Sequence, residues 1–188
     1  FSDKTTFLIE DGLTGIVGPN GCGKSNIVES LRWCMGENSA KSMRGSGMED
    51  VIFSGTSNKT SKNIAEVSVS VANKNNEGPV QFRELDEVNV RRKIEKDKGT
   101  KFYINDKEVR ARDAQMFFAD LSTGAHSPSM ISQGRIGALV TAKPTDRRAI
   151  LEEAAGISGL HVRRHEAELR LTAAENNLKR ADELRRQQ

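Results

Sequence analysis

The chain of 188 residues has no apolar stretch long enough to cross a membrane, and no signal-peptide pattern opens it. We therefore predict a cytoplasmic protein with no membrane partner. Cysteine is scarce. The two thiols, Cys22 and Cys34, bracket one predicted helix and indicate reduced side chains rather than a disulfide framework. The net charge of +3 is small, so it permits an anionic partner without requiring one.

An initiating methionine is also missing, since the chain begins at Phe1. We therefore expect a piece of a longer polypeptide. The length leaves room for about one domain, and 36% hydrophobic residues are enough to build a core. The charged content of 29% is high and fits a chain that ends in a solvated helical arm.

The most informative motif is a glycine-rich loop that fits the P-loop pattern G-x-x-x-x-G-K-[ST] at every fixed position. Its glycines allow backbone amides to converge on a phosphate chain. Lys24 can reach the β- and γ-phosphates, and the Ser25 hydroxyl can bind Mg²⁺. The sequence therefore predicts a nucleoside triphosphate site. The residues expected to contact ATP are Gly18, Pro19, Asn20, Gly21, Cys22, Gly23, Lys24, Ser25 and Asn26.

The surroundings of this loop support the prediction. Residues 13–17 are apolar and bounded by glycine, which favours a buried strand, and residues 26–35 have apolar side chains at helical spacing. A strand, a glycine-rich loop and a helix place the helix N-terminus against phosphate. Elsewhere, the pattern predicts strands at 6–9, 64–71, 88–94, 101–104 and 130–131 and helices at 112–121 and from Pro144 to 155.

The C-terminal tail has a different pattern. Ala167, Leu171, Ala174, Leu178 and Ala181 follow one another in alternating steps of four and three residues, as in the seam of a coiled coil. An ordinary amphipathic surface helix would give a similar pattern. We predict that residues 158–188 begin a coiled-coil arm and that residues 1–157 form an ATPase lobe.

An acidic residue at the end of a second buried strand, which a P-loop ATPase needs for Mg²⁺ and water, is missing. The apolar run 116–119 ends at Asp120, but the residues before it favour a helix. Residues 121–124 loosely resemble the signature of ATP-binding-cassette proteins, but they depart from it at Thr123 and precede Gln133 in the chain. The sequence therefore predicts half of an active site.

Several further blocks, together with the P-loop, resemble the N-terminal head segment of SMC proteins, and most strongly bacterial SMC. The matching blocks are residues 18–26, 32–33, 36–45, 48–55, 131–134 and 147–157. The resemblance implies an α/β fold. It would be the N-terminal half of a cassette-type P-loop ATPase head with a mixed β-sheet, followed by a coiled-coil helix. A C-terminal half of the same head would supply the signature and the catalytic glutamate.

The resemblance also implies residue roles and partners. Lys24, Arg44 and Gln133 would act in catalysis, with Ser25 and Gln133 on Mg²⁺ and Arg44 near the γ-phosphate. Arg110 and Arg112 would bind DNA phosphates without reading sequence. A second SMC subunit would complete an ATP-bound homodimer, and a kleisin subunit would join it. This complex would condense and segregate chromosomes in the nucleoid.

Three alternatives remain at this point. A recombination or repair ATPase of the RecF/RecN group would share the P-loop and Gln133, but not the whole block 41–55. A small P-loop kinase would complete its own site within this length and would not end in a coiled coil. A coiled coil with a degenerate nucleotide site conflicts with the intact Lys24 and Ser25.

Overall fold

A computed structural model describes residues 1–40, 43, 45–73, 80–121, 123–124, 127, 129–132, 135–155 and 157–187. Its helices are α1 (Lys24–Cys34), α2 (Ala111–Asp120), α3 (Arg135–Thr141), α4 (Pro144–Ala154) and α5 (Ser158–Gln187). The strands are β1 (Ile64–Ala72), β2 (Glu87–Glu95), β3 (Gly99–Ile104) and β4 (Lys107–Val109), and the 3₁₀ helices are η2 (Met48–Val51) and η3 (Val80–Phe82). Within these residues, no helix has the length and apolar character needed to cross a membrane.

The strands form one four-stranded sheet in the order β1-β2-β3-β4, and every described pairing is antiparallel. Asn105 and Asp106 connect β3 to β4 with positive φ angles of 47° and 63°, the conformation of a tight hairpin turn. The strands predicted at 64–71, 88–94 and 101–104 are confirmed, because alternating apolar residues suit a sheet with one covered face.

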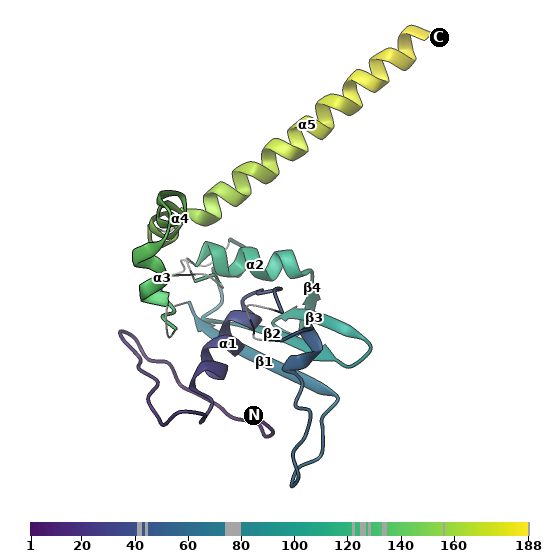
Figure 1. Ribbon diagram of the computed structural model, residues 1–188. Helices are drawn as coiled ribbons and strands as arrows, with labels where there is room; N and C mark the ends of the chain where they lie inside the picture. The colour runs from purple at the N-terminus through teal and green to yellow at the C-terminus, as the bar shows by residue number, and fades with distance from the viewer. Residues whose placement is uncertain are drawn as a thin grey trace.

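Helices α1 and α2 pack on one face of this sheet (Figure 1). The alternation along β2 buries Val88, Val90 and Ile94 toward the helices and leaves the intervening residues partly exposed. Phe117 and Phe118 of α2 complete the core with their rings packed edge to face, 5.3 Å between centroids. Residues 116–119, which end at Asp120, are helical as predicted and do not form a second buried strand.

Two predicted strands near the N-terminus, at 6–9 and 13–17, are not formed. Leu8, Leu13 and Val17 have exposed fractions of 82%, 97% and 91%, although they are apolar. An extended segment becomes a strand only when a neighbouring strand accepts and donates its backbone hydrogen bonds, and none of the described strands pairs with it. The strand predicted at 130–131 is also absent. The α/β class stands, but the described sheet is antiparallel rather than mixed.

The C-terminal helix α5 extends away from the rest of the molecule (Figure 1). Its beginning contacts α2 and α4. The predicted helix is confirmed, and the seam residues Leu171 and Leu178 are 64% and 69% exposed. The coiled coil itself needs a second helix along this seam and stays a prediction, as does the boundary between an ATPase lobe and an arm.

Candidate nucleotide-binding site

The P-loop leads directly into the first turn of α1, as its sequence predicts. Gly21 and Gly23 have φ angles of 82° and 94°, which side chains other than glycine rarely adopt. Gly23 is the N-cap of α1, and no side chain caps this helix end. A Cβ atom at Gly18 would lie 2.9 Å from Sγ of Cys22, so the two sides of the loop approach closely only because Gly18 has none.

Lys24 covers the start of the same loop. Its Nζ donates hydrogen bonds to the carbonyl oxygens of Gly18, at 2.7 Å, and Pro19, at 2.6 Å. The ammonium therefore lies at the start of the loop, and the loop leads into the N-terminus of α1, where the helix dipole is positive. Ser25, half-buried, follows in the first turn of the helix. An ammonium, a helix N-terminus and a hydroxyl form a donor set that suits phosphate and a hard cation.

The remaining predicted site residues do not all fall in the described part of the chain. Arg44 and Gln133 lie outside the described residues. Arg110 is the N-cap of α2 and Arg112 lies in its first turn, and both are exposed. Figure 1 shows this end of α2 beside β4, away from the P-loop end of α1. The structure therefore separates the predicted DNA residues from the predicted phosphate site.

The opposite end of α1 is held by a buried arginine that the sequence analysis did not single out. Arg92 of β2 is 2% exposed, and its Nη1 donates to the carbonyl oxygens of Trp33 and Glu37, both at 2.7 Å. Its guanidinium lies 4.5 Å from the ring centre of Trp33 and 4.6 Å from that of Phe102. Burial lowers the pKa of Arg92 to about 10, so the group remains charged at neutral pH.

A signal for this arginine does exist in the sequence. Arg92 occupies the same strand face as Val88, Val90 and Ile94, whereas period-two alternation would place an apolar residue there. A cation on the buried, apolar face of a strand requires hydrogen-bond or ionic partners. Here, those partners are backbone carbonyl groups at the C-terminal end of a helix, where the dipole favours positive charge.

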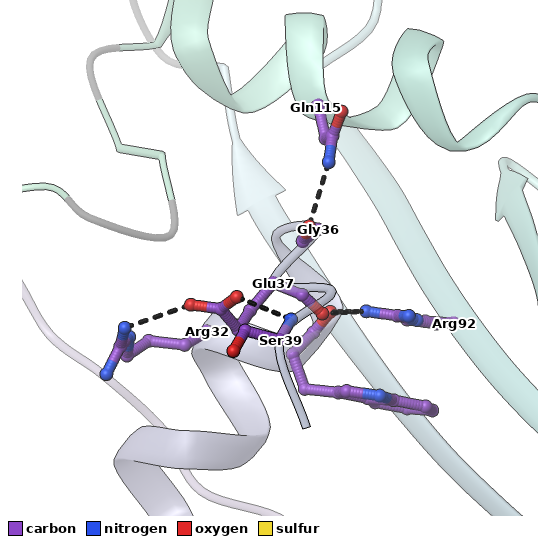
Figure 2. Close-up of polar contacts among 7 residues, drawn as sticks. Arg32, Gly36, Glu37, Ser39, Arg92 and Gln115 are labelled. Atoms are coloured by element: carbon purple, nitrogen blue, oxygen red, sulfur yellow. Dashed lines mark hydrogen bonds and ion pairs between the residues drawn. The ribbon is translucent and has the colours of Figure 1, made fainter. Parts of the chain in front are cut away.

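Residues 36–39, which we name the junction turn, connect α1 to the following loop (Figure 2). The carboxylate of Glu37 is 6% exposed and accepts hydrogen bonds from Nη2 of Arg32 at 3.1 Å and from the Ser39 amide at 2.8 Å. The side-chain amide of Gln115 on α2 donates to the Gly36 carbonyl oxygen at 2.8 Å. Three elements, α1, β2 and α2, therefore contact this turn.

The two cysteines lie in different environments. Cys22 is exposed in the P-loop, whereas Cys34 is buried at the end of α1. Burial raises the pKa of the Cys34 thiol to about 12. Its Sγ lies 3.5 Å from the carbonyl oxygens of Val67 and Val90, so it acts as a small core residue.

Comparison with known proteins identifies the family. A profile described as "RecF/RecN/SMC N terminal domain" matches residues 1–135. The chain belongs to the RecF/RecN/SMC family. This RecF/RecN/SMC chain is 55% identical over 98% of its length to a chromosome partition protein Smc of Cereibacter sphaeroides, and 53% identical over 98% to that of Rhodopseudomonas palustris. It spans 16% of the length of each relative.

Solved structures support the same assignment. An SMC ATPase structure, described in terms of ATP-driven dimerization and DNA stimulated activation, is similar with a TM-score of 0.66 and 28% identity. That match covers 78% of the RecF/RecN/SMC chain and 86% of the other chain. An Smc head domain derived from Pyrococcus furiosus, bound to the C-terminal domain of ScpA, has a TM-score of 0.65 and 29% identity, with 88% and 41% of the two chains covered. The predicted SMC resemblance and head fold are confirmed.

Proposed function

We propose that this chain is the ATP-binding N-terminal half of an SMC head. The observation that carries the proposal is Lys24, held over the glycine loop at the uncapped N-terminus of α1. In the complete protein, a C-terminal half of the head adds the signature and the catalytic glutamate. Two such heads dimerise on ATP, hydrolyse it and organise DNA during chromosome condensation and segregation.

Different residues of the proposed site bind the triphosphate and the Mg²⁺ ion. Lys24 and the loop amides bind the triphosphate, and a Mg²⁺ ion bound with it neutralises phosphate charge. Ser25 and Gln133 hold this ion, which takes its other ligands from phosphate and water oxygens. Arg44 acts near the γ-phosphate. Phosphoryl transfer depends mainly on positioning and charge, and this donor set supplies both for one half of the site.

The partners follow from the same assignment. A second copy of the protein supplies the other half of each ATP sandwich. A kleisin-type subunit joins the heads, and support comes from the similar Smc head that is bound to ScpA. DNA binds at the exposed N-terminus of α2 through Arg110 and Arg112, by phosphate contacts without sequence preference. This activity would place the protein in the nucleoid.

ATP binding by the full-length protein tests the central step. Lys24→Ala removes the ammonium and should weaken MgATP binding at least about tenfold, because hydrogen bonds to charged groups are worth about 1.5–3 kcal/mol. Lys62→Ala is the matched control, since Lys62 is exposed and outside the loop. Calorimetric titration measures both. Equal affinity in the wild type and Lys24→Ala would contradict the assignment of the site.

A further inference from the structure

We infer that Gln115 is a positioning residue that couples DNA bound at the start of α2 to the P-loop helix α1 through the junction turn. The inference rests on the proposed function, because it assumes that DNA meets Arg110 and Arg112. The inference adds a physical connection between the predicted DNA residues at the start of α2 and the predicted phosphate site at the start of α1.

The first step of the connection lies within α2. This helix has 10 residues, with Arg110 as its N-cap and Gln115 in its second turn. Five residues of helix rise about 7.5 Å, so a force on Arg110 acts on Gln115 through continuous backbone hydrogen bonds. Phe117 and Phe118, which are 3% and 0% exposed, anchor α2 in the core. The helix therefore moves as one body.

The second step joins α2 to the junction turn. Nε2 of Gln115 donates to the Gly36 carbonyl oxygen at 2.8 Å (Figure 2), and a Cβ atom at Gly36 would overlap with Cγ of Gln115. The Gln115 side chain thus contacts the bare backbone of the turn. Gly36 has a φ angle of 106° and is buried, so the turn has little room to adjust if α2 shifts.

The third step reaches α1. The amides of Gly36 and Glu37 donate to the carbonyl oxygens of Trp33 and Arg32, at 3.1 Å each, so the turn continues the last turn of α1. The ion pair of Arg32 with the buried Glu37 ties the same residues together. Lys24 begins this helix, which is 11 residues long, so the turn and the predicted phosphate site lie at its two ends. A displacement of the turn would therefore act on α1 and on Lys24 at its other end.

Two substitutions of Gln115 in the full-length protein test the inference. Gln115→Leu keeps the bulk of the side chain but removes the donor, and Gln115→Glu keeps the shape but replaces the donor with a carboxylate. Met116→Leu, on the neighbouring position of α2, is the matched control. For each protein, the affinities for MgATP and for DNA, the basal ATPase rate, the DNA-stimulated rate and the melting temperature are measured.

We expect the DNA stimulation factor to fall about fivefold in both Gln115 variants, which corresponds to about 1 kcal/mol. The basal rate and the affinity for MgATP should not change in either variant, and Met116→Leu should behave like the wild type. The affinity for DNA should not change in Gln115→Leu, whereas the carboxylate of Gln115→Glu, three residues from Arg112, should lower it. Hydrogen exchange should quicken at the amides of Gly36, Glu37 and Ser39 in the Gln115 variants. A residue with a merely structural role would instead lower the melting temperature and the basal rate together.

Three results would overturn the inference, and they separate the possible failures. If DNA stimulates the wild type and both Gln115 variants equally, the inference is overturned and the proposed function stands. If DNA does not stimulate the wild type, the DNA step of the proposed function is wrong, and the inference fails with it. Loss of stimulation with no change in exchange at the junction turn would also overturn the route through Gly36.

Discussion

The guanidinium of Arg92 stacks 4.5 Å from the centre of the Trp33 ring and also donates to the Trp33 carbonyl oxygen at 2.7 Å. Strand β2 therefore holds both the side chain and the backbone at the end of α1. Because Arg92 is 2% exposed, these contacts replace the water that a guanidinium would otherwise bind.

Arg92→Met should lower the free energy of unfolding by about 2–5 kcal/mol, because the Trp33 and Glu37 carbonyl oxygens lose a buried donor. Lys93→Met is the control. Lys93 is the next residue along β2 and is only half-buried, so its loss should cost less than about 1 kcal/mol. Urea denaturation of the full-length protein measures both. Similar losses in the two variants would show that Arg92 is not a specific anchor.

Gly36→Ala should destabilise the protein for two reasons. The φ angle of 106° disfavours any side chain, and the new Cβ would overlap with Cγ of Gln115. Adding Gln115→Ala to Gly36→Ala should remove the destabilisation that comes from the steric overlap. The destabilisation that comes from the φ angle of Gly36 should remain. Gly137→Ala is the control: nothing lies within 4 Å of its Cβ position inside α3, so it should stabilise by about 0.5–1 kcal/mol. Thermal unfolding of the four proteins measures these differences. An unchanged melting temperature in Gly36→Ala would contradict the geometry of the turn.

The thiols should differ in reactivity. At about pH 8, iodoacetamide should modify the exposed Cys22, and MgATP should slow this reaction because Cys22 lies in the P-loop. Cys34 should react only after unfolding, since burial raises its pKa to about 12 from an ordinary 9.0. Above pH 9, the unfolded thiol loses its proton before the folded one, so this group makes the folded state less stable as pH rises. Mass spectrometry of the labelled peptides shows which thiols have reacted with iodoacetamide. Labelling of Cys34 in the folded protein at neutral pH would contradict the predicted difference in reactivity.

Replacing both Arg110 and Arg112 with alanine should weaken DNA binding equally for all sequences. It should also reduce the slope of log affinity against log salt by about two units, because each phosphate contact releases about one counterion. Replacing Lys179 and Arg180 of α5 removes the same charge elsewhere and is the control. A salt titration of DNA affinity measures both slopes. An unchanged slope in the Arg110 and Arg112 variant would leave these residues as ordinary surface charges.

The purified chain of 188 residues should hydrolyse ATP at a negligible rate. The chain has only half of the catalytic residues and lacks those that position water and stabilise the transition state. These groups together raise the rate of hydrolysis by orders of magnitude. Phosphate release with the chain alone, compared with the full-length protein, provides the measurement. Turnover by the isolated chain that Lys24→Ala abolishes would contradict the split-site hypothesis.

Local patterns predicted the elements whose partners lie nearby in the chain. The strands β1, β2 and β3 alternate in the sequence and pair with their immediate neighbours along the chain, so they formed where they were predicted. Residues 13–17 have an equally strong apolar pattern but no described strand beside them, and they remain exposed. Arg92 was missed because its burial depends on Trp33 and Glu37, more than fifty residues earlier in the sequence. An apolar pattern in the sequence predicts which face of a strand is buried. It does not predict which backbone groups will contact that face.

The anchored end of α1 has a consequence for the energetics of nucleotide binding. Arg92 and Glu37 hold the last turn of this helix through contacts that involve no nucleotide. The helix is thus preorganised, and under the proposed function a triphosphate bound at Lys24 would not have to fix the axis of α1. The entropy lost on binding would then be confined to the glycine loop, so more of the phosphate contact energy would contribute to affinity.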